Sequence, residues 1–94
     1  MRIWWTNRAS AQLEAAFDFI ADDNVPAAEK QLDIIKRAVE QLANFPEMGR
    51  PGRVDGTREL VIQSTPYIVA YRVKAQLVRV VALLHGARRW PTHF

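Results

Sequence analysis

The second half of the chain carries the side chains best suited to binding an anion or moving a proton. They are Arg72, Arg79, His85, Arg88 and Arg89. Guanidinium groups pair bidentately with phosphates and carboxylates, and a strand that places them on an open sheet face presents them to a partner. An imidazole titrates near neutral pH and can transfer a proton. The set therefore indicates a contact with a phosphate or an acidic partner, or proton transfer at a phosphate.

Each of these residues also has a purely structural interpretation. Arg72 either contacts an anion or is a solvated strand arginine, free or paired with Glu59 on a neighbouring strand. Arg79 has the same two interpretations. His85 either moves protons or makes the hydrogen bonds that fix the turn at Gly86.

The tryptophans raise similar alternatives. Arg88 and Arg89 precede Trp90, and such a basic and aromatic cluster suits an interface with nucleic acid or protein. Alternatively, Trp90 folds back over the sheet edge and leaves two solvated arginines. Trp4 and Trp5 are neighbours in an expected strand and point to opposite faces, so at least one covers the core or awaits a partner.

Composition bounds the class of protein. A chain of 94 residues that is 49% hydrophobic and 24% charged is expected to form one globular domain over residues 1–94. It has no cysteine, which favours a reducing compartment, and it lacks a signal-peptide pattern and a bilayer-spanning run, so we expect a cytoplasmic protein.

Charge is distributed unevenly along the chain. Residues 1–48 hold five Lys/Arg and eight Asp/Glu, whereas residues 49–94 hold eight Lys/Arg and two acids. The second half is therefore a candidate electropositive surface for an acidic partner or a nucleic acid, or simply a soluble one.

The first half predicts a strand and two helices. Residues 2–5 are bulky and read as a strand, after which Thr6 or Asn7 can cap a helix. Residues at helical spacing then form an apolar stripe: Leu13, Ala16, Phe17 and Ile20. Asn24 can cap a second helix that begins near Val25-Pro26 and ends at residues 44–46. Its seam of Ala28, Leu32, Ile35, Val39 and Leu42 suits an antiparallel helical hairpin, and Ile34 lies off this seam.

The second half predicts a loop followed by strands. Residues 47–56 contain three glycines and a proline and are expected to be a loop. Strands are expected over residues 58–63, 67–73 and 77–84, the last buried on both faces. The fold class is therefore α+β, an N-terminal strand, a helical hairpin and a three-stranded antiparallel meander in one sheet with the helices on one face. The other face should carry Arg58, Arg72 and Arg79.

The whole length of the chain resembles one protein superfamily. The resemblance rests on Trp4-Trp5-Thr6 before a helix and on the segments Phe45-Pro46 and Gly49-Arg50-Pro51. It continues through Thr57-Arg58-Glu59-Leu60, residues 67–73, His85-Gly86-Ala87-Arg88 and Trp90-Pro91. In this order and spacing they are similar to the RelE/ParE superfamily of type II toxin–antitoxin toxins. The Leu-His-Gly-Ala-Arg ending resembles the ParE side more than the RelE side.

This resemblance implies a growth-inhibiting toxin with a cognate antitoxin. On the ParE side it implies poisoning of DNA gyrase by binding, with no catalytic centre. On the RelE side it implies a ribosome-dependent mRNA endoribonuclease, for which Arg72, His85 and Arg88 are the candidate catalytic residues. The chain departs from the RelE pattern because no lysine cluster precedes the meander and the segment after Trp90 is short. A third alternative is an inactive protein-interaction module.

Partners and site residues follow from the same interpretation. The candidate target-binding residues are Arg58, Arg72, Arg79, Arg88, Arg89 and Trp90. The antitoxin is expected to be acidic and partly disordered, to form a hetero-oligomer with the chain, and to contact Trp5, Leu13, Phe17, Ile20 and Ile34. We expect no membrane association, no cofactor and no metal site, since His85 and His93 have no cysteines and no motif spacing to recruit.

Overall fold

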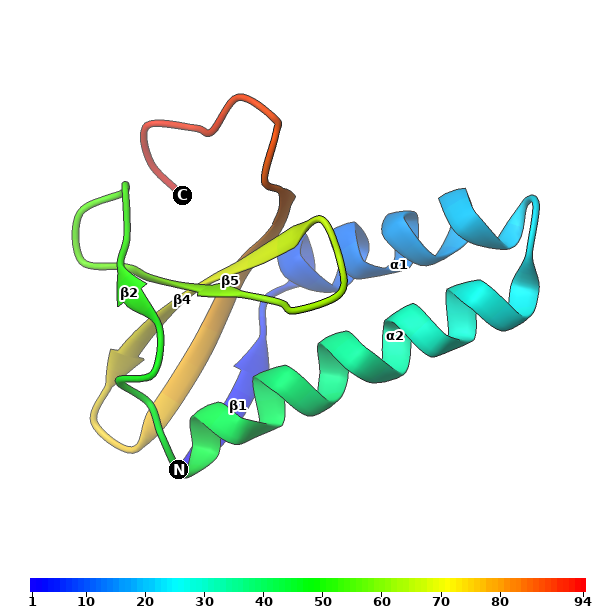
Figure 1. Ribbon diagram of the computed structural model, residues 1–94. Helices are drawn as coiled ribbons and strands as arrows, with labels where there is room; N and C mark the ends of the chain where they lie inside the picture. The colour runs from blue at the N-terminus through cyan, green and yellow to red at the C-terminus, as the bar shows by residue number, and fades with distance from the viewer.

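A computed structural model of residues 1–94 shows two layers, a five-stranded sheet and a helical hairpin (Figure 1). The elements follow one another as β1 (Arg2–Trp5), α1 (Asn7–Ala21), α2 (Val25–Glu40), the short 3₁₀ helix η1 (Gln41–Ala43), β2 (Arg50–Pro51), β3 (Arg58–Val61), β4 (Tyr67–Lys74) and β5 (Leu77–His85). The expected α+β fold class, with the helical hairpin beside an antiparallel meander, is confirmed.

The helices begin at the residues that can cap them. The Thr6 hydroxyl accepts a hydrogen bond from the Ala9 N–H at 3.1 Å, and the Asn24 side chain accepts one from the Ala27 N–H at 3.0 Å. Each bond satisfies a backbone donor that has no partner within the helix. The second helix continues into η1 and ends at Asn44, as expected from the proline that follows.

The sheet is mixed and has the strand order β1-β5-β4-β3-β2. The meander β3-β4-β5 is antiparallel, while β1 pairs parallel with β5, with Trp5 opposite Val80. Two details go beyond the sequence-based expectation. The expected loop over residues 47–56 contains the two-residue strand β2, and β3 ends two residues earlier than expected, at Val61. Pro51 is tolerated there because β2 is an edge strand that needs few backbone donors.

The main core lies between the sheet and the hairpin. It combines Ile35, Val39 and Leu42 with strand residues such as Val69 and Tyr71, and all five are almost completely buried. Ile3, Trp5, Leu13 and Ile34 pack at its margin. This core fixes the sheet against the hairpin and leaves the opposite face of the sheet to other contacts.

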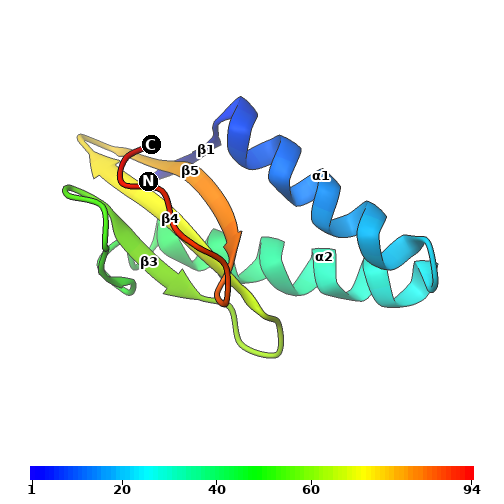
Figure 2. The same cartoon turned by 90° about the horizontal axis from the view of Figure 1, so that it is seen from above.

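The opposite face is partly covered by the end of the chain. Seen from above, the segment after β5 crosses the sheet on the side away from α2 (Figure 2). Trp90 and Phe94 pack there against a small cluster of Ala70, Val81 and Ala82. No helix is long and apolar enough to cross a membrane.

Candidate functional site

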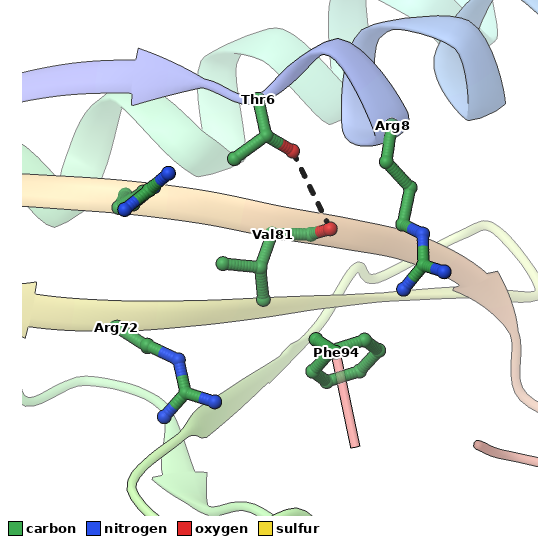
Figure 3. Close-up of a pocket in the computed structure, with 6 residues that line it drawn as sticks. Thr6, Arg8, Arg72, Val81 and Phe94 are labelled. Atoms are coloured by element: carbon green, nitrogen blue, oxygen red, sulfur yellow. Dashed lines mark hydrogen bonds between the residues drawn. The ribbon is translucent and has the colours of Figure 1, made fainter. Parts of the chain in front are cut away.

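A hollow with three arginines lies on the sheet face away from α2. We call it the arginine hollow; it has a volume of about 300 Å³ and is lined by Thr6, Arg8, Arg72, Arg79, Val81 and Phe94. Arg72 and Arg79 are directly opposite one another on β4 and β5. Arg8 is the second residue of α1. In Figure 3, Arg8 and Arg72 extend toward the Phe94 ring from two sides of the hollow. Strand register and the chain direction after β1 thus bring three cations together.

Neutral groups orient two of these arginines. The Arg72 guanidinium donates to the carbonyl oxygen of Asp55 at 3.1 Å, and the Arg79 guanidinium lies 5.9 Å from the centre of the Trp4 ring. Glu59 is therefore not the partner of Arg72, because its carboxylate is bound by Arg50 and by the backbone N–H of Arg53. None of the three arginines of the hollow forms an ion pair, since the ion pairs of the chain involve Arg37, Arg50 and Arg53.

Arg58 does not join this face as expected. Its cross-strand neighbour is Tyr71, which belongs to the core beneath the helices, so Arg58 lies on the helix side of the sheet. Its guanidinium donates to the carbonyl oxygens of Glu47 and Gly49 at 3.3 and 2.7 Å. The reason is the two-residue period of the strand, which places Arg58 on the same face as Leu60. Arg58 therefore anchors the loop that precedes β2.

A second surface, the α1 groove, lies between α1 and the end of β5. Its volume is about 480 Å³, and six of its nine lining residues are hydrophobic. Its walls include Ala15, Phe19, Leu84, His85 and Arg88. Phe19 is 77% exposed, which is unusual for so large an apolar side chain. The groove combines an apolar wall with a cation at one end.

The candidate ribonuclease residues fall on two different surfaces. Arg72 lines the arginine hollow, whereas His85 and Arg88 line the α1 groove. His85 is engaged locally, since its Nδ1 accepts a hydrogen bond from the Ala87 N–H at 3.1 Å and its ring meets Tyr67 edge-on at 5.8 Å. His85 therefore makes the local hydrogen bond expected of a residue that fixes the turn at Gly86. The three candidate residues do not lie together in one site.

The C-terminal residues also divide between two roles. Arg88 and Arg89 are exposed, while Trp90 is half-buried on the sheet face and stacks beneath the Arg53 guanidinium at 3.9 Å. Trp90 has therefore folded back over the sheet, which is the second of the two alternatives for this residue.

The expected antitoxin contacts are similarly divided. Trp5, Leu13 and Ile34 pack against the main core. Leu13 also lines, with Phe17, a shallow groove between α1 and α2, and Ile20 is half-buried.

Arg8 and Phe19 are site residues that the sequence reasoning missed. Each carried a local signal. Arg8 places a positive charge in the first turn of a helix, where a negative one is favoured. Phe19 is a large apolar residue off the buried stripe of α1. In both cases the residue type is unfavourable or unnecessary for the helix itself, and the residue instead lines a surface site.

Comparisons with known proteins agree with this architecture. The family described as ParE toxin of type II toxin-antitoxin system, parDE, matches residues 3–90. The chain is 40% identical over 90 residues to Y4kP of Sinorhizobium fredii, provisionally named a toxin, with 96% of the chain and 93% of Y4kP covered. It is 38% identical over 87 residues to Toxin RelE2 of Caulobacter vibrioides, with 93% and 97% covered.

A solved structure gives the same result at the level of the fold. A chain of the chromosomal ParDE TA system from P. aeruginosa superposes with a TM-score of 0.80 at 29% identity, covering 88% of this chain and 92% of that one. Fold and sequence together define a toxin of the RelE/ParE superfamily, from a type II toxin–antitoxin system. Within that superfamily, the chain belongs to the ParE toxin family.

Proposed function

We propose that this toxin inhibits growth by binding and poisoning DNA gyrase, and that it does not cut RNA itself. The observation that carries the proposal is the separation of Arg72 from His85 and Arg88 on two surfaces. General acid–base catalysis needs the proton-transfer group within hydrogen-bond reach of the reacting atoms, beside the cations that stabilise the phosphate. A binding poison needs only a surface that its target can bind, and the arginines of the sheet face supply one.

A supercoiling assay tests this proposal. Purified toxin is added to gyrase and relaxed plasmid, and the expected result is a dose-dependent loss of supercoiled product. Toxin already bound to its antitoxin is the matched control and should leave supercoiling intact. Undiminished supercoiling at saturating free toxin would falsify the proposal.

Ribosome-dependent RNA cleavage is the second candidate. The cations of the arginine hollow favour it, as does the likeness to a relative named RelE2. An in vitro translation reaction with the same toxin preparation separates the two candidates. Cleavage of mRNA at the codon in the ribosomal A site supports this second candidate, and intact mRNA together with inhibited gyrase supports the first.

We further propose that the antitoxin docks in the α1 groove. An apolar wall that includes Ala15, Phe19 and Leu84 suits the apolar side of an amphipathic helix, and Arg88 at the end suits an acidic side chain. The neighbouring edge of β5 adds backbone groups. β1 stops opposite Val80, and further along β5 the Leu83 N–H donates to the Gln12 side chain at 2.9 Å instead of to a β1 carbonyl. A disordered acidic segment that folds in this groove fits these features.

A further inference from the structure

The three arginines of the hollow form no ion pair within the chain. Arg72 and Arg79 are cross-strand neighbours, and like charges directly opposite one another destabilise a sheet. Arg8 lies in the first turn of α1, where the helix dipole disfavours a cation. Both placements lower the stability of the free protein, and an anion in the hollow would reverse both effects.

Local contacts orient these arginines without neutralising their charge. Arg72 is held by a backbone carbonyl and Arg79 by the Trp4 ring, so the side chains are positioned while their charges remain available. Within the chain, ion pairs join Asp33 to Arg37, and Glu59 to Arg50 and Arg53. A prepositioned and uncompensated group of cations is what an anion-binding site requires.

The number and origin of the arginines favour phosphate over carboxylate as the ligand. The three arginines come from three different elements, α1, β4 and β5, and all of them line one hollow. A carboxylate has two oxygens in one plane and is satisfied by one arginine fork, whereas a phosphate presents oxygens in several directions. Phe94 lines the hollow and Trp4 is 58% exposed beside Arg79, so aromatic rings flank the cations. Bases of a single strand stack on such rings.

We propose that the arginine hollow binds phosphate groups of a nucleic-acid backbone, by contacts from Arg8, Arg72 and Arg79. The toxin is expected to make this contact without any other protein. The inference goes beyond the proposed poisoning of gyrase, because the toxin could poison gyrase without binding nucleic acid in the hollow. DNA and RNA share this chemistry, and the test has an arm for each.

The test is fluorescence anisotropy of short labelled single strands, one of DNA and one of RNA, with the purified full-length toxin at several salt concentrations. The double variant Arg72→Gln/Arg79→Gln should bind about tenfold more weakly, and its salt dependence should be shallower by about one released counterion for each arginine that no longer meets a phosphate. The matched control is Lys30→Gln/Lys36→Gln. It removes the same charge from exposed positions on α2 and should stay within about twofold of the parent protein.

Single variants keep the test decisive if the double variant does not fold. Arg8 and Arg79 are exposed, so Arg8→Gln and Arg79→Gln are expected to fold and should each weaken binding by about threefold or more. Binding of either nucleic acid with this pattern supports the proposal, and a preference identifies the source of the phosphate. Equal losses in the lysine control, no binding at low salt, or equally tight and arginine-dependent binding of a polyglutamate peptide would overturn it.

Discussion

At the scale of single residues, two buried polar side chains determine how the loop around β2 is held. Glu59 is 2% exposed, and its carboxylate accepts hydrogen bonds from the Arg50 side chain at 3.0 and 3.2 Å and from the Arg53 N–H at 2.7 Å. Tyr71 is fully buried; its hydroxyl accepts from the Gly49 N–H at 2.9 Å and donates to the Pro46 carbonyl at 2.8 Å. Both residues therefore fix a loop with little regular structure of its own.

Glu59→Gln should lower the free energy of unfolding by about 1–2 kcal/mol, because a neutral amide makes weaker bonds to the two arginines and adds donors that face other donors. The half-exposed arginines keep access to water, which limits the loss. Equilibrium urea unfolding measures it. The matched control is Asp33→Asn, which breaks the exposed pair with Arg37 and should cost less than about 0.5 kcal/mol. Equal costs for the two variants would contradict the assigned role of Glu59.

Tyr71 should make the protein sensitive to alkaline pH. Burial raises the pKa of the Tyr71 phenol above its ordinary value of 10.0, against smaller opposing effects of the Gly49 hydrogen bond and the Arg58 charge. In the unfolded chain the phenol loses its proton near pH 10, while the folded protein still retains it. The folded state then binds more protons, so stability is complete below about pH 10 and falls as pH rises further.

Tyr71→Phe isolates this effect. The variant should cost about 1–3 kcal/mol at neutral pH, because it leaves the Gly49 N–H buried without its partner. It should also lose stability less steeply than the parent above pH 10, since the titrating group is gone. Urea unfolding at neutral and alkaline pH gives both quantities. Parallel curves for the two proteins would show that Tyr71 is not responsible for the alkaline loss.

At the scale of elements, the sequence predicts what local chemistry determines. The helices begin at Thr6 and Asn24 because their side chains cap them, and the buried seam from Ala28 to Leu42 follows from helical spacing. The parallel pairing of β1 with β5 could not be read from either strand, since it joins residues more than 70 positions apart. The short strand β2 could not be predicted from its own two residues either, because it is defined only by its pairing with β3.

The candidate site follows the same division. Arg72 and Arg79 were identified because each is a cation within an otherwise mostly apolar predicted strand, but Arg8 joins them only through the tertiary fold. Arg58 was assigned to the wrong face, because the pattern of β3 does not show which of its faces meets the helices. The half-buried position of Trp90 depends on Arg53, 37 positions earlier, and no local signal marks that contact.

The segment over residues 86–94 is held to the sheet chiefly by Trp90 and Phe94. Trp90 stacks on Arg53, yet its indole N–H is buried without a hydrogen-bond partner, which weakens the attachment. Trp90→Ala should therefore release the segment, so that trypsin cleaves after the exposed Arg88 and Arg89 about tenfold faster. Mass spectrometry of timed digests measures the rate. The control is Met48→Ala, which replaces an exposed residue in another loop. If trypsin cleaves Trp90→Ala no faster than this control, Trp90 does not restrain the segment.

At the scale of the whole molecule, the arginine hollow and the α1 groove are separate surfaces of different character. The half of the sequence that contains both helices is acidic, and the half that contains the meander is basic. The target and the antitoxin are therefore expected to be recognised by different means. The sheet face offers cations, which mainly govern the rate and salt dependence of association, whereas the α1 groove offers apolar area, which mainly governs dissociation.

Two exposed phenylalanines separate these contributions. Phe19 in the α1 groove is 77% exposed and Phe45 beyond η1 is 59% exposed, so replacing either with alanine should change the stability of the free toxin by about 0.5 kcal/mol or less. If the antitoxin covers the α1 groove, Phe19→Ala should weaken its binding at least about tenfold, mainly through faster dissociation, whereas Phe45→Ala should stay within about twofold. Calorimetry and stopped-flow dissociation with the purified antitoxin measure both effects. A larger loss of antitoxin affinity for Phe45→Ala, or equally small losses for both variants, would place the antitoxin on another surface. A loss of affinity confined to Phe19→Ala shows that antitoxin binding depends on the apolar wall of the α1 groove.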